Sequence, residues 1–145
     1  MRRRFGEVAT ALLVATSVGA CSPSYNAAAP GTLPGGTAQL TINDGASRQS
    51  GTVTCLPLGW LTRITTGDTA EGVTAFVSNE NAVGARSVNI NDVGGFTGSY
   101  VEGLQGEAYV SMTGHTYTIR GTAEGFDTDK PSIRTTGRFT IKVAC

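Results

Sequence analysis

The residues with the most distinctive chemistry in this sequence are its three cysteines, Cys21, Cys55 and Cys145. An odd number of cysteines in an exported protein requires a separate explanation for one of them. Cys21 follows VGA at positions 18–20, an aliphatic residue and two small residues, which is the pattern of a bacterial lipobox. In a lipobox the thiol is the nucleophile that accepts a diacylglyceryl group. The pattern therefore predicts that Cys21 is lipidated and is the first residue of the mature chain.

The segment before Cys21 has the anatomy of a signal peptide. Three arginines at positions 2–4 precede an uncharged run over 8–20. This run is too short to span a bilayer core, which requires about 20 apolar residues, and it fits the apolar region of a secretory signal. The anchor would hold the protein at the outer face of the cell membrane or envelope. The expected parts are a signal peptide at 1–20, a lipidated Cys21 with a flexible Pro/Gly/Ala-rich tether over 21–36, and a β-domain over 37–145.

Cys55 and Cys145 remain as a pair for a disulfide. Apolar residues alternate with others over 139–145 (FTIKVAC), which places Cys145 on the inward face of a predicted strand. Cys55 shares a face with Val53 in the same way. Exported proteins meet oxidising conditions, and closing a loop of about 90 residues contributes roughly 4–5 kcal/mol in the chain-entropy account. The sequence leaves open the alternative of two free buried thiols.

Beyond residue 37, short segments rich in Thr, Val, Ile and aromatic residues alternate with turns rich in Gly, Asn and Asp. About nine such strands indicate an all-β fold, a small antiparallel β-sandwich or open barrel with one disulfide and at most one short helix. The helix candidate is 69–79, although its β-branched residues favour a strand. The first two strands could form a hairpin, and a polar loop is expected over 124–131. The expected strands cover 40–42, 51–56, 61–66, 73–78, 86–91, 96–101, 107–112, 116–122 and 135–143.

Side chains that could catalyse a reaction or hold a metal are few. The single histidine, His115, lies between Gly and Thr in the context of a hairpin turn. An envelope hydrolase would have to build a Ser–His–Asp arrangement around that turn, and the sequence has no GxSxG elbow. Asp127 and Asp129 match the start of a calcium loop but lack its Gly and distal Glu. We therefore expect no enzymatic activity, no cofactor and no metal.

The charge of the mature chain argues against nucleic acid as a partner. Removing residues 1–20 leaves 8 basic and 10 acidic side chains, a net charge of about −2 without a basic cluster. Nucleic-acid binding needs a basic face. The expected partner is instead the membrane, which the protein reaches through its lipid anchor.

An apolar segment, LPLGWL at 56–61, follows Cys55 directly. Leu58, Trp60 and Leu61 are candidates for lining a pocket that takes an acyl chain or another apolar ligand, or for forming a surface that binds a partner. A third interpretation places Trp60 and its leucine neighbours in the core of the domain, as is common for a lone Trp.

Four segments resemble the mycobacterial 19 kDa lipoprotein antigen family: GTVTC at 51–55, SVNI at 87–90, YTIRGTAEG at 117–125 and FTIKVAC at 139–145. The resemblance implies a cell-envelope lipoprotein that is a surface-exposed antigen without an established enzymatic activity. It also implies that host Toll-like receptor 2 senses the acylated N-terminus. The alternative function is that of a carrier of a lipid or other apolar ligand.

Overall fold

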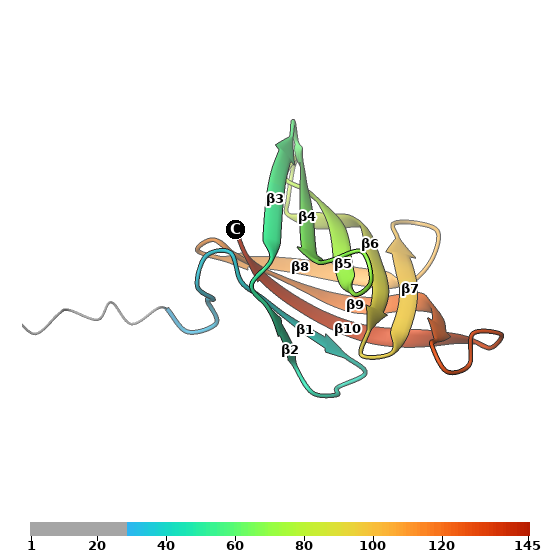
Figure 1. The fold of residues 1–145 in the computed structure, drawn as a ribbon. Helices are drawn as coiled ribbons and strands as arrows, with labels where there is room; N and C mark the ends of the chain where they lie inside the picture. The colour runs from blue at the N-terminus through green and yellow to red at the C-terminus, as the bar shows by residue number, and fades with distance from the viewer. Residues whose placement is uncertain (1–28) are drawn as a thin grey trace, which may run out of the picture.

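In the computed structural model, residues 29–145 are described, so the predicted signal peptide and the lipidation of Cys21 lie outside the described part of the chain. The described residues form ten β-strands and no helix (Figure 1). Within these residues there is no helix long and apolar enough to cross a membrane. The strands are β1 (Ala38–Ile42), β2 (Arg48–Ser50), β3 (Val53–Leu58), β4 (Leu61–Gly67), β5 (Gly72–Ser78), β6 (Gly84–Val93), β7 (Phe96–Val101), β8 (Glu107–Thr113), β9 (Thr116–Asp127) and β10 (Arg134–Ala144).

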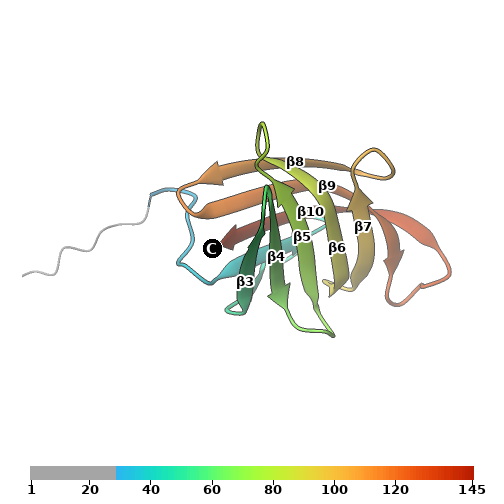
Figure 2. The ribbon, with the colours of Figure 1, turned by 90° about the horizontal axis from the view of Figure 1, so that it is seen from above.

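The ten strands form one antiparallel sheet that folds into two layers. Strands β3 to β7 make one layer in sequence order, and β2, β1, β10, β9 and β8 make the other. β7 joins the layers because it pairs with β6 on one side and with β9 on the other. Figures 1 and 2 show that the strands of one layer run across those of the other, as in orthogonally packed sheets. The predicted all-β fold, a sandwich or open barrel, is confirmed.

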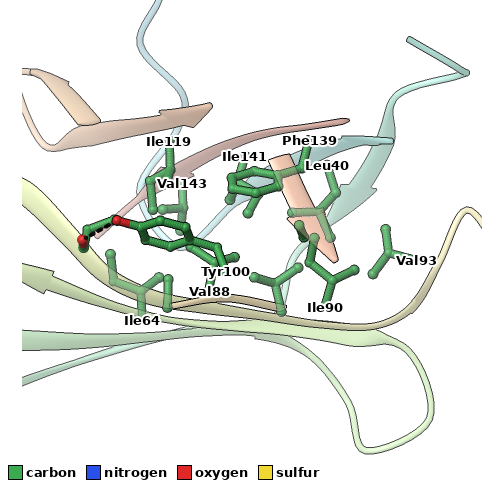
Figure 3. Close-up of a cluster of buried hydrophobic side chains, with 14 of the residues drawn as sticks. Leu40, Ile64, Val88, Ile90, Val93, Tyr100, Ile119, Phe139, Ile141 and Val143 are labelled. Atoms are coloured by element: carbon green, nitrogen blue, oxygen red, sulfur yellow. Dashed lines mark hydrogen bonds between the residues drawn. The ribbon is translucent and has the colours of Figure 1, made fainter. Parts of the chain in front are cut away.

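The space between the two layers is filled by aliphatic and aromatic side chains (Figure 3). Alternate residues of β10, Phe139, Ile141 and Val143, point inward and are buried, as the period-two pattern predicted. They face Val88 and Ile90 of β6, which are also buried. Each such side chain contributes about 1.5–3 kcal/mol when it leaves water. The core between the layers is therefore the main source of stability.

Glycines allow the sheet to fold over at the pairing of β7 with β9. Gly98 of β7 is the cross-strand partner of Gly125 of β9, and a Cβ on Gly125 would lie 1.9 Å from the carbonyl oxygen of Thr97. The ring of Phe96 covers Gly98 and Gly137, and a Cβ on either glycine would lie 2.6 Å from its Cζ atom. Glycine inside a strand commonly marks a bend or a close backbone approach. We call Phe96, Gly98, Gly125 and Gly137 the crease.

The predicted hairpin between the first two strands is wrong in its second strand. The expected strand 51–56 corresponds to β3, which passes into the other layer and pairs with β4, whereas the partner of β1 is β2, a strand directly before the expected one. The break between β2 and β3 falls at Gly51-Thr52, which is exposed and lies outside both strands. The chain therefore changes layers at the start of the segment that was expected to complete the hairpin.

The structure also settles the helix candidate and the polar loop. The helix candidate 69–79 is the strand β5, as its β-branched residues favoured. The loop expected over 124–131 begins later, because β9 continues to Asp127. The end of β9 pairs with β7 on one side and with β10 on the other. The backbone of this polar segment therefore belongs to the sheet rather than to a loop.

Candidate functional site

The Cys55–Cys145 disulfide joins the two layers at the edge where the sheet does not close. Cys55 lies in β3, Cys145 directly follows β10, and their Cα atoms are 5.9 Å apart across a sequence separation of 90. β2 and β3 end the strand order and are not paired with each other. We call this edge the open edge. The predicted disulfide is confirmed, and the alternative of two free thiols is wrong.

The N-terminal segment attaches to the same side of the domain. The Leu33 amide donates to Thr116 Oγ1 at 3.0 Å, and the Gly36 amide donates to the Ala144 carbonyl at 2.9 Å. The Ala144 amide in turn donates to the Thr37 carbonyl at 2.9 Å. The last residues of the segment expected to be a flexible tether are therefore bound to the domain from Leu33 onward.

The candidate chemical side chains remain separate. His115 occupies the turn between β8 and β9, as predicted, where Gly114 has φ +58° and the His115 carbonyl accepts the Cys145 amide at 3.1 Å. Asp127 ends β9, and Asp129 lies in the following loop. Within residues 29–145 no group of three or more His, Cys, Asp or Glu side chains could hold a metal.

The apolar candidates meet at the end of the β3–β4 hairpin, which projects from the rest of the molecule in Figure 1. The strands are joined by the two-residue turn Gly59-Trp60, where Gly59 has φ +66°. A positive φ at the first turn position is the reason for Gly there. Leu58 and Leu61 form the last cross-strand pair. Leu58 is 45% exposed and Trp60 is 51% exposed, so the interpretation of Trp60 as a core residue is wrong.

Behind the turn, apolar side chains continue along the outer face of this layer. Leu56 of β3, which is 40% exposed, pairs with Arg63 of β4, which pairs with the half-buried Phe76 of β5. The inward face of the same strands carries Cys55 and Ile64. The candidate pocket residues are therefore brought together on an outer surface rather than around an enclosed cavity. We call this surface the tip patch: Leu56, Leu58, Trp60, Leu61 and Phe76.

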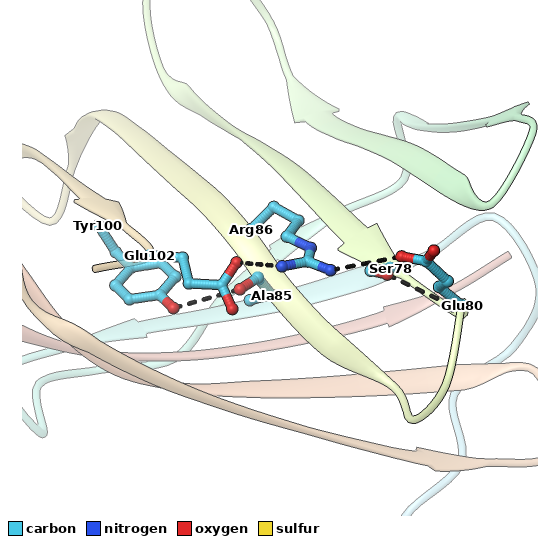
Figure 4. A network of polar contacts seen from close by, with 6 residues as sticks. All are labelled: Ser78, Glu80, Ala85, Arg86, Tyr100 and Glu102. Atoms are coloured by element: carbon cyan, nitrogen blue, oxygen red, sulfur yellow. Dashed lines mark hydrogen bonds and ion pairs between the residues drawn. The ribbon is translucent and has the colours of Figure 1, made fainter. Parts of the chain in front are cut away.

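Arg86 lies beside the indole of Trp60. Its guanidinium carbon is 5.7 Å from the ring centroid, within the range of a cation–π interaction. The guanidinium also donates to Glu102 at 2.5 Å and lies 3.8 Å from Glu80 (Figure 4). The hydrogen bond to Glu102 raises the pKa of Arg86. Exposed ion pairs of this kind contribute little to stability, and the two glutamates hold the guanidinium beside the ring.

Sequence reasoning did not identify Arg86, because its position depends on a β-bulge. Phe76 pairs with Ser87, but the next residue, Val77, pairs with Ala85, so Arg86 is the extra residue of β6. A bulge changes the direction of a side chain relative to the regular alternation. Nothing in the local sequence marks this shift.

A polar hollow of about 410 Å³ lies on another part of the surface, over β6, β7 and β9. Several of its side chains hydrogen bond to one another or to their neighbours: Gln105 Nε2 donates to Ser99 Oγ at 2.7 Å, and Thr136 Oγ1 donates to Glu124 Oε1 at 2.8 Å. The hollow and the tip patch thus differ in kind. Several polar groups of the hollow have internal partners, whereas Leu56, Leu58 and Trp60 of the tip patch are exposed to water.

Known proteins with similar sequences are mycobacterial lipoproteins. The sequence model of the Mycobacterium 19 kDa lipoprotein antigen matches residues 31–145. A putative lipoprotein of Mycobacterium indicus pranii is 40% identical over 94% of this chain and 95% of its own length. A putative lipoprotein of Mycobacterium avium subsp. hominissuis is 35% identical over 100% and 97%. Lipoprotein LpqH of Mycobacterium tuberculosis is 31% identical over 81% and 74%. The chain therefore belongs to the Mycobacterium 19 kDa lipoprotein antigen family.

Proposed function

We propose that this lipoprotein antigen is held at the outer face of the cell envelope by acyl groups on Cys21 and presents its β-domain there as a binding module. The observation that carries the proposal is the Cys55–Cys145 disulfide, which uses the other two cysteines and leaves Cys21 for the lipid. The lipobox at 18–21 and the lipoproteins among the relatives support the same assignment.

The chemistry of the anchor explains why it is stable. One acyl chain gives only marginal membrane binding, and stable anchoring takes two. A diacylglyceryl thioether on Cys21 supplies two chains, and acylation of the α-amino group adds a third. The covalent chain between Cys21 and the first domain contact at Leu33 spans at most about 40 Å. The domain would therefore stay near the surface of its own membrane.

Intact mass spectrometry combined with phase partitioning tests the anchor. We expect the mature chain to begin at Cys21, to be heavier by two or three acyl chains, and to partition into the detergent phase. Cys21→Ala should leave the domain folded and move it to the aqueous phase, whereas the matched control Ser22→Ala should stay in the detergent phase. An unlipidated mature chain, or a Cys21→Ala protein found entirely in detergent, would refute the anchor.

A finer part of the proposal is that host Toll-like receptor 2 senses the acylated N-terminus. It is supported by the family resemblance and by the lipobox. Cells that express the receptor should respond to the acylated protein and not to the Cys21→Ala protein at equal concentration. Cells without the receptor are the control. A response to Cys21→Ala of equal size would contradict this part alone.

The second candidate function is transport of a lipid or other apolar ligand. The exposure of Leu58 and Trp60 favours it, because a carrier needs apolar groups that a ligand can reach. Because side chains fill the space between the layers, we expect any such ligand at the tip patch rather than between the layers. Native mass spectrometry should then find a co-purified lipid that is lost in Leu58→Ser. Protein free of lipid in both forms would argue against a carrier.

A further inference from the structure

We infer that the tip patch docks on the lipid surface of the membrane that holds Cys21, with Leu58 and Trp60 entering the interfacial layer. The inference rests on the proposed anchor, because the anchor keeps the domain close to that surface. It assigns one occupant to this exposed apolar surface: a bilayer with anionic headgroups.

The shape and composition of the tip suit an interface between water and lipid. Leu56, Leu58 and Trp60 are 40%, 45% and 51% exposed, and all three lie at the end of one hairpin. Contiguous exposed apolar groups mark interaction surfaces more often than isolated ones do. Trp is enriched at membrane–water interfaces because its ring is amphipathic. A two-residue turn places Trp60 at the extreme end of the hairpin, where it would meet a bilayer first.

The backbone of the tip can approach lipid because several of its polar groups have partners. The ladder between β3 and β4 continues to the pair Leu58 and Leu61, directly before the turn. The Trp60 carbonyl accepts the Asn79 amide at 2.9 Å. Pro57 also belongs to β3, so this residue of the edge strand has no amide hydrogen to leave unpaired. Satisfied backbone groups reduce the cost of entering a medium without water.

Two basic side chains beside the patch can contact anionic headgroups. Arg63 is exposed between Leu56 and Phe76, and Arg86 lies beside the Trp60 ring. Long basic side chains can keep their charge at the headgroup level while their stems contact apolar groups. The acidic neighbours Glu80 and Glu102 lie within ion-pair distance of Arg86. Their negative charges offset the positive charge of Arg86, so the attraction to anionic lipid rests mainly on Arg63.

The tip patch is also within reach of the anchored membrane. Leu33 and Cys145 line one hollow, so the chain from Cys21 enters the domain beside the disulfide. From Cys55, β3 and the turn lead to Trp60 over about 17 Å. This is less than the chain of about 40 Å between Cys21 and Leu33 allows. By contrast, the β9–β10 loop that carries the exposed Ile133 lies at the other end of the molecule (Figures 1 and 2).

The single Trp of the chain makes the inference directly testable. The acylated protein is reconstituted in vesicles of phosphatidylcholine and phosphatidylglycerol, with or without bromine on the acyl chains near the headgroups. We expect brominated lipid to quench Trp60 emission, and the emission in either vesicle to lie at shorter wavelength than in water. Leu58→Ser should weaken the quenching, whereas Ile133→Ser should leave it unchanged.

The Cys21→Ala protein, titrated with the same vesicles, tests docking without the anchor. We expect weak binding, and a partition coefficient lower on the order of tenfold in Leu58→Ser and in Arg63→Glu. Unquenched Trp60 in an acylated protein that floats with the vesicles would overturn the docking and leave the anchor intact. An acylated protein that does not float with the vesicles would contradict the anchor. The titration of the Cys21→Ala protein would then still show whether the tip patch binds lipid. A concentration-dependent emission shift without lipid would assign the patch to a second copy of the chain and overturn the inference.

Discussion

The two layers of the sandwich are held together at their two edges by different means. At the crease the backbone ladder continues from β7 to β9, and glycines make room for the fold. At the open edge β2 and β3 do not pair, and the Cys55–Cys145 disulfide joins the layers instead. At the crease, the ladder can continue from one layer to the other only because the glycines there have no side chains. At the open edge, one covalent bond between two side chains takes the place of the missing ladder.

This difference predicts how each edge responds to change. The disulfide acts largely by restricting the unfolded chain, so its removal lowers the free energy of unfolding while the folded structure keeps its contacts. The crease acts in the folded state, where an added methyl group has no space. The two edges should therefore be distinguishable by substitutions that add or remove very few atoms.

The largest effect is expected at the open edge. Replacing both Cys55 and Cys145 by Ala should lower the free energy of unfolding by about 4–5 kcal/mol, since the loop that the bond closes spans 90 residues. Cys55 is only half-buried and Cys145 is exposed, so lost packing adds little. Urea unfolding of the double variant checks this. Reduced wild-type protein should behave in the same way, and a loss below about 1 kcal/mol would mean that other contacts close this edge.

The next effect is expected at the crease. Gly125→Ala should lower the free energy of unfolding by about 3 kcal/mol, because its Cβ would lie 1.9 Å from the Thr97 carbonyl oxygen. Gly51→Ala is the matched control near the open edge, where a Cβ would have no atom within 4 Å. That change should be neutral or slightly stabilising, because Ala restricts the unfolded chain more than Gly does. Equal losses in the two variants, measured by urea unfolding, would contradict the distinction between the edges.

Periodicity in the sequence predicts the faces of the strands better than the path between them. The alternation in FTIKVAC placed Phe139, Ile141 and Val143 on the core face correctly, and the alternation around Cys55 placed Cys55 against the core. The alternation in FTIKVAC was wrong for Cys145, which follows the end of β10 and is exposed, although it forms the predicted disulfide. The alternation around Cys55 also directs Leu56 and Leu58 outward, so the sequence contained the signal for the exposed tip. It was obscured because a run of leucines beside a Trp has the composition of a core segment.

Other features depend on interactions that local sequence does not carry. The layer change at Gly51-Thr52 depends on where β3 finds its partner, and the position of Arg86 depends on a register shift against β5. The fold class, the disulfide and the residues at the tip could be predicted from composition and spacing. The bulge, the crease and the outward direction of Trp60 required the pairing of strands that are distant in sequence.

The smallest effect concerns Tyr100, which lies where β7 separates from β9. The last β7–β9 pair is Ser99 with Glu124, after which the Tyr100 ring is buried and its hydroxyl donates to the Ala85 carbonyl at 3.2 Å. Tyr100→Phe keeps the ring and removes this hydrogen bond. It should lower the free energy of unfolding at neutral pH by about 1 kcal/mol, less than the changes at either edge.

The pH dependence of stability tests the same Tyr100 hydroxyl. Burial, followed by the nearby Glu102 carboxylate, raises the pKa of Tyr100 above its usual 10.0. The neutral phenol is therefore favoured in the folded state, and its contribution is fully present below pH 10.0 and lost as the pH rises through the raised pKa. Wild-type protein should lose more stability than Tyr100→Phe between pH 9 and 11, about the window around the usual tyrosine pKa. Because Phe cannot ionise, parallel stability curves for the two proteins would show that Tyr100 titrates alike in the folded and unfolded chains, and that its hydroxyl is open to water.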